Sequence, residues 1–466
     1  MRIEDTDLER SDIKYEREIL DSLKWLGLAH DEGPDVGGPY GPYRQSERLT
    51  TYKKYLVKML QNGSAFYCFH TEGELEVEKK EQMEEKLPIL HICKDWRNLS
   101  PEEAEKKHEA GEASIIRFKM PATSPETPPN YQITFYDMVR GGQVHFFARL
   151  LGDFSLAKSL DVPLYNFAAV IDDHEMQITH VIRGEEHIPN TPKQILIARA
   201  LGWAPEVGVL SEPPWKYAHL PLVLGPDRSK LSKRHGATSI DEYRAMGYLP
   251  EALINFMVLL GWNSGTEKEI FSLSKLVEIF DIAHVQKSGA IFNMEKLDWM
   301  NGEYIREKSL KELLQLAESF LPKGAEKFPE EYISKVLALE QPRLKKLSEI
   351  KDKTDYFFAS PDYDVELLRW KDQVGDDVRK SIDRSIELLS KIESQNPPVS
   401  NLEHIFLPAA EEAGDRGRLL WPLRAALSGK KASPGPFELM AVLGRDESLA
   451  RLENAREKLV SSENLR

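Results

Sequence analysis

Strand-like segments lie before Ser309 in this 466-residue chain, and helical periodicity dominates from there to the end. In the first part, short apolar runs at residues 164–171 and 178–183 read as strands, end in polar clusters and are followed by helical patterns. Short strands that alternate with helices indicate a parallel α/β sheet, where ligands bind beyond the carboxyl ends of the strands. The chain is therefore expected to form an α/β part followed by an all-α part.

The composition is that of a soluble, multidomain protein. Hydrophobic residues make up 41% and charged residues 30%, and no apolar run of about 18 residues is long enough to span a membrane. Two cysteines exclude a disulfide scaffold and are typical of the reducing cytoplasm. The net charge of −14 argues against non-specific nucleic-acid binding over the whole surface, although local basic strips remain.

Two thiol–imidazole pairs form the first candidate site. Cys68 and His70 are separated by one residue, as are His91 and Cys93, and the pairs lie about 20 residues apart on either side of a polar helix. Together they supply the four ligands of a tetrahedral zinc site. The one-residue spacing is unusual for zinc, so unligated side chains are the alternative.

Two basic features form two further candidate sites. Lys230 and Lys233 lie three residues apart in a turn-rich loop, so both can reach one polyphosphate; an ordinary solvated basic loop is the alternative. Arg183 ends an apolar strand and could grip a carboxylate at two points. An internal ion pair with Glu185 or Glu186 is the alternative for this arginine.

Seven short motifs resemble the bacterial-type glutamyl-tRNA synthetases, which are class I aminoacyl-tRNA synthetases. Each motif is weak alone, but their order and spacing make the resemblance specific over almost the whole chain. The loop at 230–234 matches the KMSKS signature, with Leu for Met and Arg for the final Ser. The motifs are RIEDTD (2–7), GPYRQSER (41–48), YNFA (165–168), VIRG (181–184), KLSK (230–233), WMNG (299–302) and PLRAALSG (422–429).

The resemblance implies an α/β, Rossmann-like class I synthetase catalytic domain with an inserted α+β module, followed by all-α anticodon-binding domains. The expected boundaries are a split catalytic domain at 1–63 and 164–205, an inserted acceptor-binding module at 64–163, a domain carrying the KMSKS loop and stem contacts at 206–303, and two helical anticodon-binding domains at 304–372 and 373–466.

The resemblance also implies an ATP-dependent, Mg²⁺-requiring attachment of glutamate to tRNA(Glu) through a glutamyl-adenylate, with tRNA needed for glutamate activation. We expect a cytoplasmic monomer that does not bind membranes. The residues carried over by position are Lys230 and Lys233 as catalytic lysines, Lys230, Ser232 and Lys233 for ATP, and Glu4, Tyr165 and Arg183 for glutamate.

Arg343 lies in a basic strip of the helical region and is expected to read the anticodon. In the family, an arginine after this proline marks enzymes that charge tRNA(Glu) strictly, and a glutamine marks those that also charge tRNA(Gln). A guanidinium can donate to the acceptors of cytosine at the third anticodon position, whereas uracil presents an N–H there. The alternative is a phosphate contact shared with Lys345 and Lys346.

The sequence departs from the family at its start. The class I His-Ile-Gly-His motif, which precedes RIEDTD in the family, does not occur in the sequence. A start codon placed too late is favoured over a fragment, because everything downstream looks intact. A glutamyl-queuosine tRNA synthetase is disfavoured by the long helical region, and a glutaminyl-tRNA synthetase by the expected lack of β-barrels. A truncated, non-catalytic tRNA-binding relative is the remaining alternative.

Overall fold

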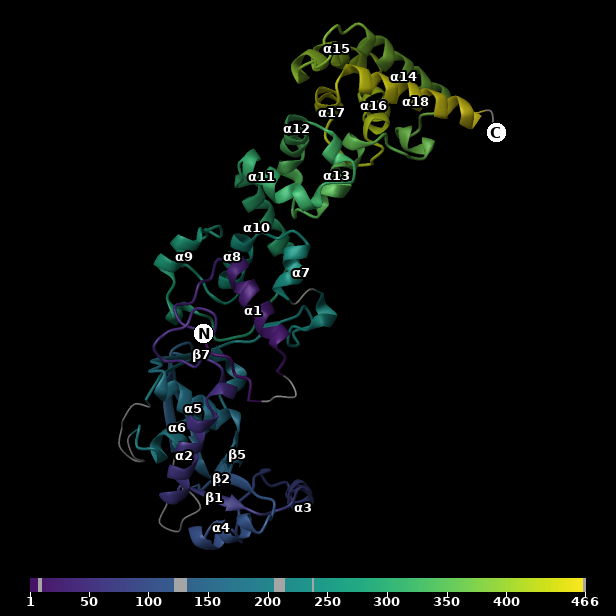
Figure 1. Ribbon diagram of the computed structural model, residues 1–466. Helices are drawn as coiled ribbons and strands as arrows, with labels where there is room; N and C mark the ends of the chain where they lie inside the picture. Colours follow the sequence, from purple (N-terminus) through teal and green to yellow (C-terminus); the bar gives the residue numbers. More distant parts are fainter. Residues whose placement is uncertain (7–10, 121–131, 205–213, 237–238, 464–466) are drawn as a thin grey trace. The chain divides into compact units, whose positions relative to one another are not determined.

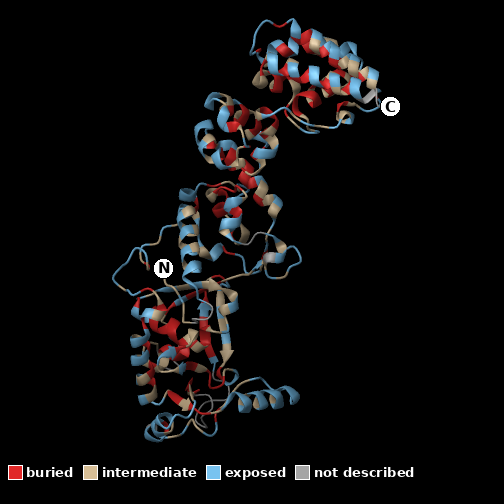
Figure 2. Cartoon of the chain, turned by 45° about the vertical axis from the view of Figure 1, so that its right-hand side comes forward, coloured by how far each residue is buried: buried red, intermediate tan, exposed pale blue. Residues whose placement is uncertain are grey.

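A computed structural model describes residues 1–6, 11–120, 132–204, 214–236 and 239–463 (Figure 1). The chain divides into two compact units. The first comprises Met1–Gly236 and Met257–Phe292, and the second comprises Ala237–Phe256 and Asn293–Arg466. In the first unit the buried residues gather between the sheets and the helices, and in the second they gather between the helices (Figure 2).

A four-stranded sheet of the first unit has the strand order β4-β3-β8-β7. β7 (His180–Gly184) and β8 (Lys216–Leu220) are parallel, β3 (Gln132–Asp137) is parallel to β8, and β4 (Gly142–Phe147) is antiparallel to β3. The register places Arg183 beside His219 and Asp137 beside Tyr217. The carboxyl ends of three parallel strands therefore meet at one edge, where such sheets bind ligands.

Three helices pack into the core of this unit: α2 (Leu49–Gln61) with one face, and α5 (Tyr165–Glu175) and α6 (Thr191–Ala200) with most of their residues. The strand expected at 164–171 is wrong, because these residues belong to the first turns of α5. Phe167 and Ile171 are fully buried and their neighbours nearly so. A helix that is buried all round shows an unbroken apolar run, so periodicity cannot distinguish it from a strand.

A second, antiparallel sheet has the order β1-β2-β5-β6. Its strands are β1 (Ala65–Cys68), β2 (Ile115–Phe118), β5 (Ser155–Ser159) and β6 (Val162–Pro163), and α3 (Glu72–Glu84) and α4 (Pro101–Glu109) lie between β1 and β2 in the chain. β3 and β4 also fall within residues 64–163, yet they join the other sheet through β8. The extent of an inserted module remains a prediction.

The first unit also contains α1 (Ile13–Trp25), α9 (Leu273–Ile279) and a two-stranded parallel pair, β9 (Val223–Leu224) with β10 (Ala290–Ile291).

The second unit is helical, and its described residues form no strand, as expected for the region after Ser309. Ser239 caps α7 and forms a capping box with Glu242. Phe406, Leu423 and Leu452 are fully buried in its core. The helix α8 (Pro250–Gly261) begins in this unit and its residues from Met257 on belong to the first unit. The helices that lie wholly in the second unit are α7 (Ile240–Ala245), α10 (Met294–Glu307), α11 (Leu310–Ala317), α12 (Glu330–Glu340), α13 (Glu349–Phe358), α14 (Gly375–Ser390), α15 (Val399–Glu412), α16 (Gly417–Ser428), α17 (Pro436–Leu443) and α18 (Arg445–Glu463).

Candidate functional site

A pocket of about 700 Å³ extends along β7, from Ile178 before the strand to His187 beyond its carboxyl end. The N-terminal segment contributes Arg2 and Glu4 to its wall, α5 contributes Tyr165, and β7 with the turn after it contributes Arg183 and His187. The three residues that the sequence assigned to glutamate, which are Glu4, Tyr165 and Arg183, therefore line one cavity.

The guanidinium of Arg183 is held on two of its three nitrogens. Its Nη2 donates to Thr191 Oγ1 at 2.7 Å and to Gln194 Oε1 at 2.8 Å, and its Nε donates to His219 Nε2 at 3.3 Å. Its Nη1 has one acceptor among the described residues, the Tyr165 hydroxyl at 3.5 Å. Because Nη2 carries two protons and both are used, Nη1 is the nitrogen left for a ligand.

The internal ion pair considered for Arg183 does not form. No carboxylate of the described residues lies within 4.0 Å of its guanidinium; Glu185 pairs instead with Arg140 at 2.9 Å. Glu186 lies 3.8 Å from Lys230. The positive charge of Arg183 is thus surrounded by neutral acceptors, which favours an anionic ligand at its free side.

A network of arginines and carboxylates places Glu4 at the pocket. Arg2 donates through Nη2 to Glu4 and through Nη1 to Asp173, each at 2.8 Å. Burial would lower the pKa of Arg2, but the charges of Asp173 and Glu4 raise it above its usual value. Asp172, the neighbour of Asp173, is fully buried and accepts from Arg48 Nε at 2.6 Å. Arg48 therefore neutralises the charge of Asp172. Glu4 remains 36% exposed and can meet a cation.

Tyr165 carries a polar group that faces Arg183. Its hydroxyl lies 3.2 Å from His187 Nδ1. Burial raises the pKa of Tyr165, so the phenol stays protonated, while burial and the charge of Arg183 lower the pKa of His187. Asn190 Nδ2 donates to the same His187 nitrogen at 3.3 Å, so Nδ1 is an acceptor and the Tyr165 O–H is directed at it. Because a hydroxyl hydrogen rotates, this O–H can turn from His187 to a carboxylate held at Arg183 Nη1.

The basic loop presents Lys230 to solvent, with its side chain 69% exposed. The backbone N–H of Ser232 donates to His235 Nδ1 at 3.1 Å, which closes the loop on itself. Lys233 begins a 3₁₀ turn, Lys233–His235, and its side chain lies outside the described part of the structure. The structure therefore describes Lys230 and Ser232 of the expected phosphate-binding set in full.

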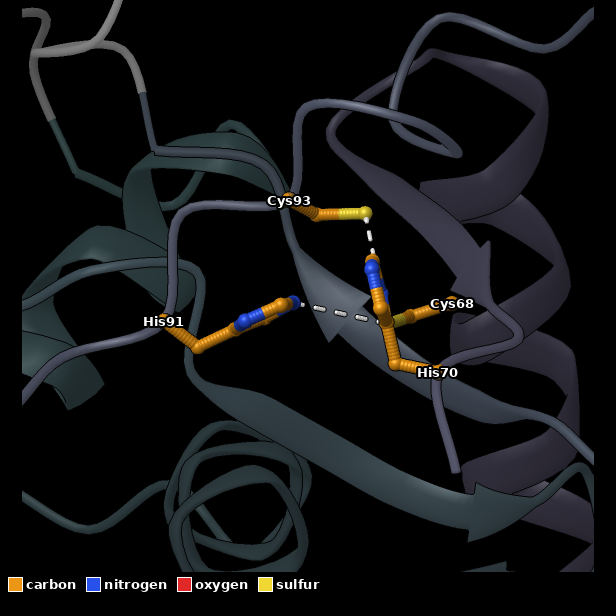
Figure 3. Close-up of side chains that lie close together, drawn as sticks. All are labelled: Cys68, His70, His91 and Cys93. Carbon is orange, nitrogen blue, oxygen red and sulfur yellow. Dashed lines mark hydrogen bonds between the residues drawn. The ribbon is translucent and has the colours of Figure 1, made fainter. Parts of the chain in front are cut away.

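The four zinc-site candidates converge in the first unit, with their ligand atoms all within 4.8 Å of one another (Figure 3). Cys68 Sγ lies 3.3 Å from His70 Nδ1 and 3.6 Å from His91 Nε2, and Cys93 Sγ lies 3.8 Å from His70 Nδ1. Hydrogen bonds from Cys93, His91 and His70 outweigh burial and lower the pKa of Cys68, which favours its thiolate.

A buried carboxylate fixes the loop that carries two of these residues. Asp153 is 1% exposed and accepts from the backbone N–H of Cys93 at 3.0 Å and of Met120 at 2.9 Å. Gly152 lies against the same loop, where a Cβ atom would be 2.7 Å from the carbonyl oxygen of His91. A larger residue at 152 would collide with the backbone of His91.

Arg343 ends the turn Gln341–Arg343 after α12. Its Nη1 lies 3.3 Å from a carboxylate oxygen of Glu340, which is 1% exposed and also accepts from the Tyr356 hydroxyl at 3.1 Å. Burial raises the pKa of Glu340. The Arg343 side chain is itself 35% exposed, so the guanidinium is anchored at one end and open to a partner at the other.

Sequence reasoning missed the groups that hold Arg183. Thr191 and Gln194 begin a helix, and His219 ends a strand, so none stands in a recognisable motif. The available signal was a lone histidine at the end of an apolar strand, next to the strand that ends in Arg183.

Comparisons with known proteins agree over nearly the whole chain. Residues 1–299 match the family described as "tRNA synthetases class I (E and Q), catalytic domain", and residues 312–456 match "Anticodon binding domain". A glutamate--tRNA ligase of Desulforamulus reducens is 41% identical, covering 98% of this chain and 92% of that protein. One of Carboxydothermus hydrogenoformans is 42% identical, covering 97% and 92%.

Solved structures give the same result. The structure of a glutamate tRNA ligase from Elizabethkingia meningosepticum in complex with its amino acid superposes with a TM-score of 0.83 at 32% identity, covering 98% of this chain and 92% of that one.

None of the described helices is both long enough and apolar enough to cross a bilayer.

Proposed function

The chain belongs to the class I glutamate--tRNA ligases, which use ATP to attach glutamate to tRNA, and we propose that it binds glutamate in the pocket along β7. The observation that carries this proposal is Arg183, a cation at the pocket wall with neutral partners only and one nitrogen left for an anion. A pocket so built favours a ligand with a carboxylate side chain.

The two carboxylates of glutamate need different treatment. Arg183 Nη1 and the Tyr165 hydroxyl would hold the side-chain carboxylate, and Glu4 would hold the α-ammonium group. The side-chain carboxylate of glutamate would then be held at two points, by one arginine nitrogen and by one phenol. This arrangement leaves the α-carboxylate free to attack the α-phosphate of ATP, giving glutamyl-adenylate and pyrophosphate.

The Mg²⁺–ATP complex is the second substrate, and we assign its phosphates to Lys230, Ser232 and Lys233. The exposed ammonium group of Lys230 and the short loop around it suit a polyphosphate. Adenylyl transfer depends mainly on positioning and charge neutralisation, so lysines that meet the leaving pyrophosphate would act in the transition state. The glutamyl group then passes to the terminal adenosine of tRNA.

The cluster Cys68, His70, His91 and Cys93 fits a structural zinc ion. With zinc bonds of the usual length, neighbouring ligands of a tetrahedron lie about 3.3–3.8 Å apart. Three of the four sulfur–nitrogen distances are 3.3, 3.6 and 3.8 Å, and all four ligand atoms lie within 4.8 Å of one another. The outer ring nitrogens of both histidines also meet carboxylates, Asp95 at 3.1 Å and Glu78 at 2.6 Å, as zinc-binding histidines do.

We assign anticodon reading to Arg343, because its guanidinium is anchored by the buried Glu340 and partly open to solvent. A fixed donor can distinguish cytosine from uracil, whereas a mobile one would favour any phosphate. We also infer a monomer that acts in the cytoplasm, where its tRNA is found.

Exchange of labelled pyrophosphate into ATP tests the proposed glutamate site. Exchange should require glutamate and tRNA(Glu), and aspartate and glutamine should support it poorly. An exchange rate that does not depend on which amino acid is added would refute the assignment of glutamate to this pocket. Binding of tRNA without exchange would favour the non-catalytic relative.

A further inference from the structure

The strand order brings a buried carboxylate and a buried imidazole behind Arg183. Asp137 ends β3, His219 lies near the end of β8, and Arg183 lies near the end of β7, so the three residues follow one another across the sheet. Asp137 and His219 have fully buried side chains. Neither touches the pocket directly, and the proposed mechanism gives neither of them a role.

The hydrogen bonds between these three residues determine which nitrogen of His219 carries the proton. Arg183 Nε can only donate, so His219 Nε2 at 3.3 Å must accept. A neutral ring then carries its proton on Nδ1, which donates to Asp137 Oδ2 at 2.6 Å. The opposite tautomer would turn an N–H of His219 against the N–H of Arg183.

Asp137 is itself fixed as an ionised acceptor. Its Oδ1 accepts from the backbone N–H groups of Val139 at 3.1 Å and Arg140 at 2.8 Å, and its Oδ2 also accepts from the backbone N–H of His219 at 3.1 Å. Burial would raise the pKa of Asp137, but the bonds from His219 and Arg140 hold it below its usual value.

We propose that Asp137 and His219 are positioning residues that hold Arg183 with Nη1 toward glutamate, by keeping His219 as the Nδ1–H tautomer. The proposal rests on the proposed glutamate pocket. Thr191 and Gln194 restrain Nη2, and His219 restrains Nε; the Thr191 hydroxyl also lies 3.1 Å from His219 Nε2. Two restrained nitrogens fix the plane of the guanidinium, so Asp137 and His219 aim Nη1 at glutamate without touching the ligand themselves.

Substitution of His219 tests this role by kinetics. His219→Phe keeps an aromatic ring but removes the acceptor for Arg183 Nε. Its KM for glutamate should rise roughly tenfold or more, as expected when a hydrogen bond to a charged group is lost. Its KM for ATP should not change. His219→Gln retains a side-chain acceptor and should recover part of the loss. His145→Phe, on the exposed face of β4, is the matched control and should equal the parent.

Nitrogen NMR of the full chain labelled at its histidines tests the tautomer without any need for turnover. The expected spectrum has a protonated Nδ1 and an unprotonated Nε2 at His219, assigned by its loss in His219→Phe or His219→Gln. A protonated Nε2 would overturn the proposal, and so would an unchanged KM for glutamate in a folded His219→Phe protein. If the parent itself shows no glutamate-dependent exchange, the proposed function fails, and the NMR result still decides the tautomer.

Discussion

The carboxylates behind the two histidines of the Cys68–His70–His91–Cys93 cluster should tune its zinc affinity unequally. Glu78 meets His91 at 2.6 Å and is 34% exposed, whereas Asp95 meets His70 at 3.1 Å and is 66% exposed. Loss of such a partner weakens metal binding by about 10- to 100-fold. Because the shorter and better shielded bond is the stronger one, Glu78→Gln should reach that range, and Asp95→Asn should cost less than about tenfold.

Competition with a chromophoric zinc chelator measures these affinities. Glu81→Gln is the matched control, because Glu81 lies exposed on the same helix and contacts neither histidine among the described residues. Cys93→Ser should abolish tight binding, since it removes a ligand. Equal zinc affinities for Glu78→Gln and Glu81→Gln would refute the assigned role of Glu78. A parent protein that does not bind one zinc ion per chain would refute the site.

Three further substitutions address catalysis and tRNA choice. Lys233→Ala should slow adenylate formation by orders of magnitude in ATP–pyrophosphate exchange while tRNA affinity stays nearly unchanged, because its contact would form mainly in the transition state; near-normal exchange would exclude that role. Arg183→Lys should raise the KM for glutamate by about 10- to 100-fold, because an ammonium cannot satisfy the partners of Nε and Nη2 and still reach the ligand; an unchanged KM and turnover would make Arg183 structural. Arg343→Gln should increase charging of tRNA(Gln) relative to tRNA(Glu), and unchanged discrimination in a charging assay with both transcripts would leave Arg343 as a phosphate contact.

Short spacings made the cluster predictable from the sequence. Cys68 ends β1 and His70 follows two residues later, and His91 and Cys93 share one loop, so only one long-range approach was needed to complete the set. That approach depends on the buried Asp153, which no local pattern reveals. The one-residue spacing within each pair is compatible with a four-ligand site, because each pair contributes one sulfur and one nitrogen.

The support of Arg183 was beyond sequence reasoning. Asp137 and His219 are 82 residues apart, and they meet only because β3 and β8 are neighbours in the sheet. The α5 segment was misread for a related reason, since burial on all sides removes the polar face that marks a helix. Hydrophobic periodicity predicted the helices and strands that have one face exposed to solvent. It failed for elements that tertiary packing buries on all sides, because their sequences show no alternation of polar and apolar residues.

Direct charging of tRNA tests the central claim. The chain is incubated with labelled glutamate, Mg²⁺–ATP and tRNA(Glu), and the label in acid-precipitable tRNA is followed with time. We expect ATP-dependent accumulation of base-labile glutamyl-tRNA, lost in Arg183→Lys at low glutamate and restored in part at high glutamate. Binding of tRNA(Glu) with no glutamyl-tRNA formed at any glutamate concentration would contradict it.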